Sequence, residues 1–348
     1  MKPQFPLIDF LDEMAGRPGA TDITLCSNGR VGLRQNARMA VMTLAPLKEL
    51  WAETMAGHFR ARPADPRCSC TVVLSGQKGA RFRAMLAASH EGETLSVRFL
   101  AASIRSPSEL LLPSGLEDRF TRLRGGLFLV CGPSGSGKST TIASLLRSRG
   151  AVAGGKTVSI ENPVELVHES MENCLFVQRE LGESVRSYSE GLEEALQMNP
   201  DVISVQELRE PAAAETALSA ALSGHLVIAS IHATTASTAP QRFLSLINPS
   251  LDDAGARDAL ASCLEGVVMQ RLVPGYDRLV PVFEVLLLRD GAERLHTVER
   301  LVRQGNWLGL RQEMEGGRHG MMTLEESLRQ RTEEGLIAGA SWATGGTP

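Results

Sequence analysis

A glycine-rich segment at residues 132–140, Gly-Pro-Ser-Gly-Ser-Gly-Lys-Ser-Thr, has the residue types and spacing of a phosphate-binding P-loop. Its glycines let the backbone turn tightly, so that successive N–H groups can point at phosphate oxygens. The lysine can reach the β- and γ-phosphates, and the serine after it can ligate Mg²⁺. We therefore expect a nucleoside triphosphate to be bound by Gly132, Pro133, Ser134, Gly135, Ser136, Gly137, Lys138, Ser139 and Thr140.

Both flanks of this segment agree with that prediction. Residues 127–131 form a short apolar run that is typical of a buried parallel strand. Residues 138–149 contain no further Gly or Pro and predict a helix that Gly150 ends. The positive end of that helix dipole would lie at the phosphates. The alternative is a chance glycine-rich turn, and a strand before it with a helix after it argues against that alternative.

Three later segments offer the acidic and polar groups that hydrolysis needs. Glu165 follows a predicted strand at 157–160 and could polarise an attacking water. Glu207 follows a β-branched run at 202–206, which is the form of a Walker B strand that holds Mg²⁺. The alternative readings are a solvated loop carboxylate and an ordinary acid at a strand end.

Two histidines, His225 and His232, bracket the apolar strand predicted at 226–231. His232 stands at the carboxyl end of that strand, where it could sense a γ-phosphate. A structural hydrogen-bonding role is the alternative for each of them. Glu165, Glu207, His225 and His232 are thus the candidate catalytic residues, and Ser139 and Glu207 are the candidate metal ligands.

The composition is that of a globular protein with an ample core. The chain has 348 residues, 43% of them hydrophobic and 22% charged, and its formal net charge is −4. The acidic balance gives no electrostatic reason to expect nucleic acid as a partner. No apolar run approaches the roughly 20 residues that a transmembrane helix needs, so we expect no transmembrane segment. The six cysteines are scattered, which favours free thiols over a zinc site.

Hydrophobic periodicity divides the chain into domains. Residues 1–100 predict a small α+β domain, and residues 101–115, with Pro107 and Pro113, predict a linker. Residues 116–275 alternate strand and helix, which predicts a parallel sheet with both faces covered. We expect residues 276–348 to be mainly helical, with Thr323 capping a final helix. In the first domain we expect helices at 7–14 and 47–59 and strands at 22–25, 30–34, 71–75, 80–87 and 94–100.

Taken in order, these segments resemble the bacterial type II/IV secretion and pilus ATPases, the GspE/PilT superfamily. Its Asp box, Walker B and His box look like IENPVELVHES, NPDVISVQELRE and SGHLVIASIHATTA. Its PAS-like N-terminal domain is similar to ATDITL at 20–25, ARFRAML at 80–86 and SVRFL at 96–100. Further family patterns are similar to residues 267–274 and 320–337. The resemblance therefore covers nearly the whole chain.

This resemblance implies an α/β fold with a RecA-like P-loop NTPase core after the PAS-like domain. It also implies a homohexameric ring that uses ATP and Mg²⁺. Glu165 aligns with the family's catalytic glutamate, Glu207 with the Walker B glutamate, and His225 and His232 with the His-box pair. Arg83 and Arg98 match arginines that reach the nucleotide phosphates, where guanidinium groups neutralise charge. Two further family arginines match Arg179 and Arg209.

Within the family, the chain resembles the shorter PilT type, which is linked to pilus retraction and twitching motility. It begins directly at the PAS-like domain and has no four-cysteine insertion. The resemblance implies a cytoplasmic protein, peripheral at the inner membrane of a bacterial cell. Its expected partner is a membrane-embedded pilus platform or secretion-system protein.

Three departures keep alternatives open. Asn162 stands where the Asp box usually has Asp, and Gln206 stands where Gly usually precedes the Walker B glutamate. The segment LRDGAERLHTVERLVRQGNW lacks the signature of the retraction ATPases. The alternatives are an ATPase of another secretion or conjugation system, and a ring subunit that binds ATP with little hydrolysis.

Overall fold

A computed structural model of the chain describes residues 7–35, 38–44, 70–75, 80–90, 92–100, 103–247 and 254–338. The chain forms two compact units. The first unit extends to Ser103 and also includes Pro163–Val167, and the second unit comprises Ile104–Asn162 and the chain from His168 onward. The short segment around Glu165 thus groups with the first unit, although it lies far along the chain. The helix predicted at 47–59 lies outside the described residues.

The first unit contains helix α1 (Leu7–Ala15) and an antiparallel sheet with strand order β3-β2-β1-β6-β5-β4. Along β5, Phe82 and Ala84 are buried, so Arg81 and Arg83 point to the opposite face of the sheet. Strand β3 is almost wholly exposed, which explains why the sequence pattern did not predict it. The strands are β1 (Ala20–Cys26), β2 (Arg30–Gln35), β3 (Arg38–Thr43), β4 (Cys70–Ser75), β5 (Arg81–Ser89) and β6 (Gly92–Leu100).

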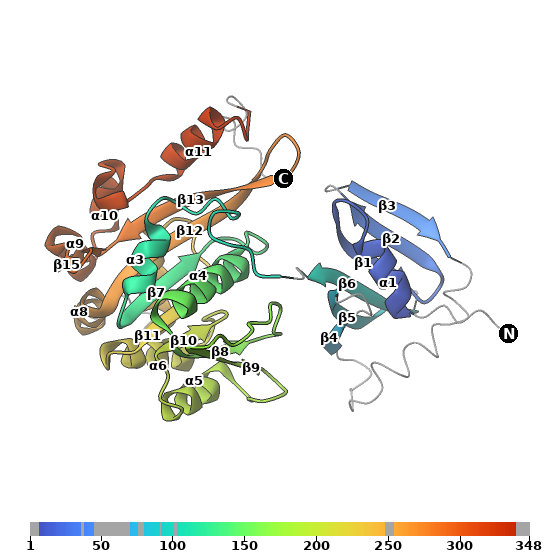
Figure 1. Ribbon diagram of the computed structural model, residues 1–348, viewed down its shortest axis with the longest axis horizontal. Coiled ribbons are helices and arrows are strands. Elements are labelled where there is room, and N and C mark those ends of the chain that lie inside the picture. Colours follow the sequence, from blue (N-terminus) through green and yellow to red (C-terminus); the bar gives the residue numbers. More distant parts are fainter. Residues whose placement is uncertain are drawn as a thin grey trace. The chain divides into compact units, whose positions relative to one another are not determined.

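The second unit is built on a seven-stranded sheet with the order β13-β12-β7-β11-β10-β8-β9 (Figure 1). Strands β12 to β9 in this order are parallel, and only β13 runs antiparallel to its neighbour. Every residue of β7, β10 and β11 is buried, as expected of central strands covered on both faces. The strands are β7 (Gly126–Cys131), β8 (Gly155–Glu161), β9 (Cys174–Glu180), β10 (Val202–Val205), β11 (Leu226–Ile231), β12 (Leu264–Pro274) and β13 (Leu279–Leu287).

Helices cover both faces of this sheet. Helix α4 connects β7 to β8 in one direction along the sheet, and α6 connects β10 to β11 in the other direction. Right-handed crossovers therefore place α4 and α6 on opposite faces. The helices before β12 are α3 (Leu116–Arg122), α4 (Lys138–Ala153), α5 (Tyr188–Gln197), α6 (Pro211–Leu222), α7 (Ala239–Ile247) and α8 (Ala254–Cys263).

After β12 the chain returns to the sheet once more as β13, so the predicted helical region begins later than expected. The Thr323 hydroxyl accepts a hydrogen bond from the Glu326 N–H, which confirms the predicted cap of the last helix. The elements after β13 are β14 (Arg289–Asp290), β15 (Glu293–Arg294), α9 (His296–Gln304), α10 (Trp307–Glu315), the 3₁₀ turn η1 (Arg318–Gly320) and α11 (Leu324–Glu333). Among the described residues, no helix combines the length and apolarity needed to cross a membrane.

The prediction that Gly150 ends the helix after the P-loop is wrong. Helix α4 continues to Ala153, and Gly154, with φ +65°, stands at its end. A Cβ atom at Gly150 would lie 2.8 Å from the Cys174 Sγ of β9. This glycine therefore allows α4 to pack closely against the sheet, a requirement that the sequence alone does not show.

His168 is the residue at which the chain re-enters the second unit. Its ring is stacked on that of Phe176, with the ring centroids 4.5 Å apart. Burial, with a smaller effect from Arg147, lowers the pKa of His168 from its ordinary value of 6.5 to about 4. The unfolded chain therefore binds a proton between these pH values that the folded chain does not bind. This difference makes folding less favourable as the pH falls from 6.5 toward 4.

We expect the His168→Phe variant, which keeps an aromatic ring on Phe176, to lose less stability in acid than the natural chain. Between pH 7 and pH 4 the natural chain should lose about 1–3 kcal/mol more unfolding free energy than the variant. Urea denaturation at a series of pH values measures this difference. Parallel pH profiles for the two proteins would contradict the prediction.

Candidate functional site

The carboxyl ends of four parallel strands lie side by side in the second unit. In spatial order, β7 leads into the P-loop, β11 into His232, β10 into Gln206 and Glu207, and β8 into Asn162. Ligands of open α/β sheets bind at this edge, beyond the carboxyl ends of the strands. The fold therefore gathers most of the predicted site residues of the second unit along one edge.

The P-loop has the backbone conformation that its glycines permit. Gly132, Gly135 and Gly137 have φ values of +141°, +76° and +91°. Gly137 is the residue before α4, and no side chain caps that helix. The first N–H groups of α4 thus lack a side-chain cap, as they do where a helix binds an anion.

Gln270 of β12 lies directly beneath the P-loop. A Cβ atom at Gly132 would lie 2.2 Å from the Gln270 carbonyl oxygen, and one at Gly137 would lie 2.8 Å from Gln270 Nε2. The buried Gln270 side chain also accepts a hydrogen bond of 2.6 Å from the Thr141 hydroxyl of α4. Sequence reasoning missed this residue, because nothing in the segment at 267–274 shows that β12 pairs with β7.

Lys138 and Ser136 fit a phosphate group. Lys138 Nζ lies 2.9 Å from the carbonyl oxygens of both Gly132 and Pro133. Burial lowers the pKa of Lys138, and the nearby Glu207 carboxylate opposes this effect. The Ser136 hydroxyl is buried and has no hydrogen-bond partner within the described part of the chain. A half-buried cation, an unpaired buried hydroxyl and uncapped helix N–H groups together suit a polyphosphate.

Glu207 is the centre of a polar chain across three strand ends. His232 Nε2 lies 2.7 Å from Glu207 Oε1, and Arg209 donates a 2.5 Å hydrogen bond to Glu207 Oε2. On its other side, His232 Nδ1 lies 3.3 Å from the Gly132 carbonyl oxygen. His232 therefore lies between two oxygen atoms that can accept hydrogen bonds, one from the P-loop backbone and one from Glu207.

The surroundings of Glu207 keep it ionised. Burial alone raises its pKa, but the hydrogen bond from Arg209 and the charges of His232, Arg209 and Lys138 bring the pKa below its usual value. An ionised carboxylate and the Ser139 hydroxyl are oxygen ligands of the kind that Mg²⁺ prefers. The donor set therefore fits the predicted metal ion.

The structure does not bring His225 to this edge. His225 precedes β11, and its Nδ1 lies 3.1 Å from the Ser223 hydroxyl. The six-residue strand β11 separates it from His232 by about 20 Å at 3.3 Å per residue. His225 is therefore not among the groups at this edge of the sheet, and the catalytic role predicted for it stays a prediction. Arg179 of β9 pairs with Glu194, which is a structural role.

In the first unit, Glu165 is held by β5. Arg83 Nη1 lies 3.2 Å from Glu165 Oε1, while Arg81 donates hydrogen bonds of 2.6 and 2.8 Å to the carbonyl oxygens of Glu165 and Val164. Arg98 of β6 stands opposite Arg83 in the strand register and is exposed. The sequence predicted Arg83 and Arg98 but missed Arg81. The roles predicted for Glu165, Arg83 and Arg98 stay predictions.

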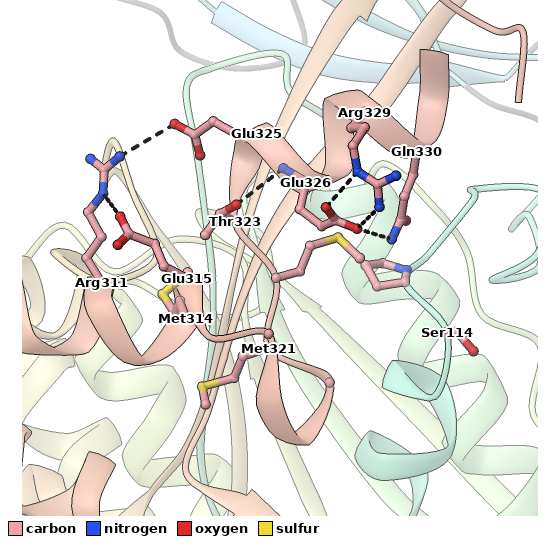
Figure 2. Close-up of a pocket in the computed structure, with 14 residues that line it drawn as sticks. Ser114, Arg311, Met314, Glu315, Met321, Thr323, Glu325, Glu326, Arg329 and Gln330 are labelled. Carbon is pink, nitrogen blue, oxygen red and sulfur yellow. Dashed lines mark hydrogen bonds and ion pairs between the residues drawn. The ribbon is translucent and has the colours of Figure 1, made fainter. Parts of the chain in front are cut away.

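A cavity of about 760 Å³ in the second unit is not part of this site (Figure 2). It lies among α10, η1 and α11, and it shares no residue with the P-loop or the Glu207 chain. Its arginines are already paired: Arg311 with Glu315 at 3.1 Å and Glu325 at 3.5 Å, and Arg329 with Glu326 at 2.7 Å. The geometry gives no unpaired charge there that would select a phosphate.

Comparison with known proteins identifies the family. The profile of the type II/IV secretion system protein family matches residues 28–330. The chain belongs to this family. This confirms the resemblance that the P-loop, Walker B and His-box segments indicated.

Two curated relatives illustrate the range of this secretion-protein family. The chain is 31% identical over 321 residues to the uncharacterized protein YggR of Escherichia coli, covering 91% of this chain and 95% of that protein. It is 32% identical over 264 residues to the type IV pilus retraction ATPase PilT of Pseudomonas aeruginosa, covering 74% of this chain and 73% of that protein. The chain is thus related to pilus motors and secretion ATPases.

Among solved structures, the pilus retraction motor PilT with bound ADP has the same fold. The TM-score is 0.82 and the identity 28%, and the match covers 96% of this chain and 95% of that one. The likeness confirms the predicted α/β fold class with its mostly parallel sheet.

The contact between the P-loop and Gln270 can be tested with two variants of this protein, each of which replaces one P-loop glycine. Gly132→Ala should lose about 2–4 kcal/mol of unfolding free energy, because its Cβ meets the Gln270 backbone. Gly135→Ala, where nothing lies within 4 Å of a Cβ atom, should lose only about 1–2 kcal/mol from its left-handed φ. Urea denaturation of both variants measures the difference, and equal losses would contradict the close approach of β12.

Proposed function

We propose that this chain is the subunit of a hexameric ATPase motor that hydrolyses ATP with Mg²⁺ and drives type IV pilus retraction. The observation that carries the proposal is the polar chain from Gly132 through His232 and Glu207 to Arg209, next to Lys138. This chain joins the P-loop to the Walker B and His-box residues at one edge of the sheet. The related PilT structure, which contains ADP, supports nucleotide binding.

The nucleotide phosphates are held by the P-loop N–H groups and by Lys138. In the present geometry Lys138 donates to neutral carbonyl groups of Gly132 and Pro133. A phosphate oxygen is a stronger acceptor because the hydrogen bond is then charge-assisted. The lysine therefore exchanges its carbonyl partners for the β- and γ-phosphates when ATP binds.

Ser139 and Glu207 would hold the metal ion, which would neutralise charge on the phosphates. His232 lies between the P-loop and Glu207, so its position depends on both, and it reports the presence of the γ-phosphate. Glu165 accepts a proton from the water that attacks the γ-phosphorus, and the bond to the ADP oxygen then breaks. Arg83 and Arg98 stabilise the charge on the transferred phosphoryl group.

The relative PilT, described as a pilus retraction ATPase, supports retraction, and the family resemblance of the sequence motifs supports the hexamer. In this proposal the protein is cytoplasmic, at the inner membrane, and works on a membrane-embedded pilus platform protein. A secretion or conjugation role is the alternative, since the family profile is described as type II/IV secretion. Affinity capture with the purified protein separates the two by recovering either a pilus platform or a secretion channel component.

A second candidate is a ring subunit that binds ATP but turns it over slowly. Asn162 and Gln206 motivate this candidate, because each departs from the family pattern beside Glu207. The presence of Glu207 and His232 in one polar chain, with Lys138 next to it, favours the active enzyme. An Asn side chain also keeps an oxygen that can accept a hydrogen bond from a metal-bound water.

We expect steady-state phosphate release with Mg-ATP to depend on Lys138 and Glu165 in different ways. Lys138→Ala should abolish both ATP binding and turnover. Glu165→Gln should leave binding intact and lower kcat by about 100-fold or more, because the amide cannot accept the proton. A fluorescent ATP analogue measures binding, and a coupled phosphate assay measures turnover.

The exposed Glu169 provides a matched control, since Glu169→Gln removes the same charge four residues away and should leave the rate unchanged. Turnover per subunit should rise with protein concentration as the ring assembles. Tight ATP binding with turnover no faster than that of Glu165→Gln would instead support the slow ring subunit.

A further inference from the structure

The loop that carries Glu165 leaves the second unit after Asn162 and returns to it at His168. Its five inner residues, Pro163–Val167, group with the first unit, where Arg81 and Arg83 hold Val164 and Glu165. The loop is therefore joined to the second unit at both of its ends. The groups that hold those ends bear on the position of Glu165.

Gln206 holds the first end. Its side-chain Oε1 accepts a hydrogen bond from the backbone N–H of Asn162. An N–H group can only donate, so the partner atom must be the amide oxygen. The two residues at which this chain departs from the family pattern thus contact each other directly.

The backbone of Gln206 is itself rigidly placed. Its N–H donates a 3.0 Å hydrogen bond to the Ile160 carbonyl oxygen of β8, and its carbonyl oxygen accepts from the Ser230 hydroxyl of β11. A glycine at position 206 could make both of these bonds. Only a side chain with an acceptor adds the third bond, which extends the link between β10 and β8 beyond the last paired residues, Val205 and Ile160.

Gln178 holds the second end in the same way. Its Oε1 accepts a 2.7 Å hydrogen bond from the His168 N–H, and its Nε2 donates to Glu161 Oε1 at 2.8 Å. The His168 ring stacks on Phe176, two residues earlier in β9. Both ends of the loop are therefore fixed to neighbouring strands by the side-chain amide of a glutamine.

We propose that Gln206 and Gln178 are positioning residues that pin the two ends of the loop carrying Glu165. The inference rests on the proposed function, because it assigns the pins to the position of the catalytic glutamate. In this proposal, Gln206 does not indicate a site that has lost its ability to hydrolyse ATP. Its amide oxygen holds the Asn162 backbone at the start of the loop.

The test uses the full-length protein with Gln206→Leu, which keeps the size but removes the acceptor, and Gln206→Glu, which keeps an acceptor. Exchange of the Asn162 backbone amide, measured by NMR without nucleotide, should be about tenfold faster in Gln206→Leu and near the natural rate in Gln206→Glu. Gln178→Leu should have the same effect on the His168 amide. The exposed Gln197 supplies the control variant, Gln197→Leu, with no change at either amide.

Steady-state kinetics then tests the link to Glu165. Gln206→Leu and Gln206→Gly should lower kcat about tenfold while KM changes by less than about twofold, because the pin positions a catalytic group without binding ATP. Unchanged exchange at Asn162 would overturn the pin. Faster exchange at Asn162 with an unchanged or increased kcat would overturn the positioning role of Gln206. An increased kcat in Gln206→Gly is the result expected if Gln206 is instead what slows turnover in a ring subunit with little hydrolysis. If the natural protein releases no phosphate, the proposed function fails, and amide exchange alone decides the pin.

Discussion

Parallel pairing of β7, β11, β10 and β8 is the interaction on which the candidate site depends. Parallel strands end at the same edge of a sheet, so groups as far as 100 residues apart in the sequence meet there. Each strand contributes one functional group: the P-loop, His232, Glu207 or Asn162. The burial of β7, β10 and β11 fixes these strand ends, because the strands cannot shift without disrupting the core.

The antiparallel extension β12–β13 adds a second constraint. Strand β12 pairs with β7 and brings the Gln270 backbone so close to Gly132 that no larger residue fits. These glycines of the P-loop therefore allow the close approach of β12, besides the phosphate binding that we propose for them. The hydrogen bond from Thr141 to Gln270 joins the first turn of α4 to the same strand. The loop shape is thus supported from beneath.

Electrostatics at the site is organised around one carboxylate. Glu207 is partly buried, and this alone would favour its neutral form, but the hydrogen bond from Arg209 and the nearby side chains of His232 and Lys138 lower its pKa. Glu165 is in a different situation, since its partner Arg83 belongs to the first unit. The two acidic residues that the family resemblance pairs are therefore held by different parts of the chain. The loop from Asn162 to His168 joins Glu165 to the second unit at both of its ends.

The sequence by itself determined the local features. The spacing at 132–140 specified the P-loop, hydrophobic runs specified β7, β10 and β11, and the Thr323 cap specified the start of α11. These features depend on neighbouring residues only, so a linear pattern contains them. The ordered motifs also identified the family correctly.

Tertiary structure decided the rest. Gly150 and Gln270 owe their roles to strands that reach them from elsewhere in the chain, and no local pattern encodes such a contact. In the sequence Gln206 is only a departure from the family pattern, but in the folded chain the backbone N–H of Asn162 lies within its reach. A side chain's role at a site depends on its distance to groups that only the folded chain brings near.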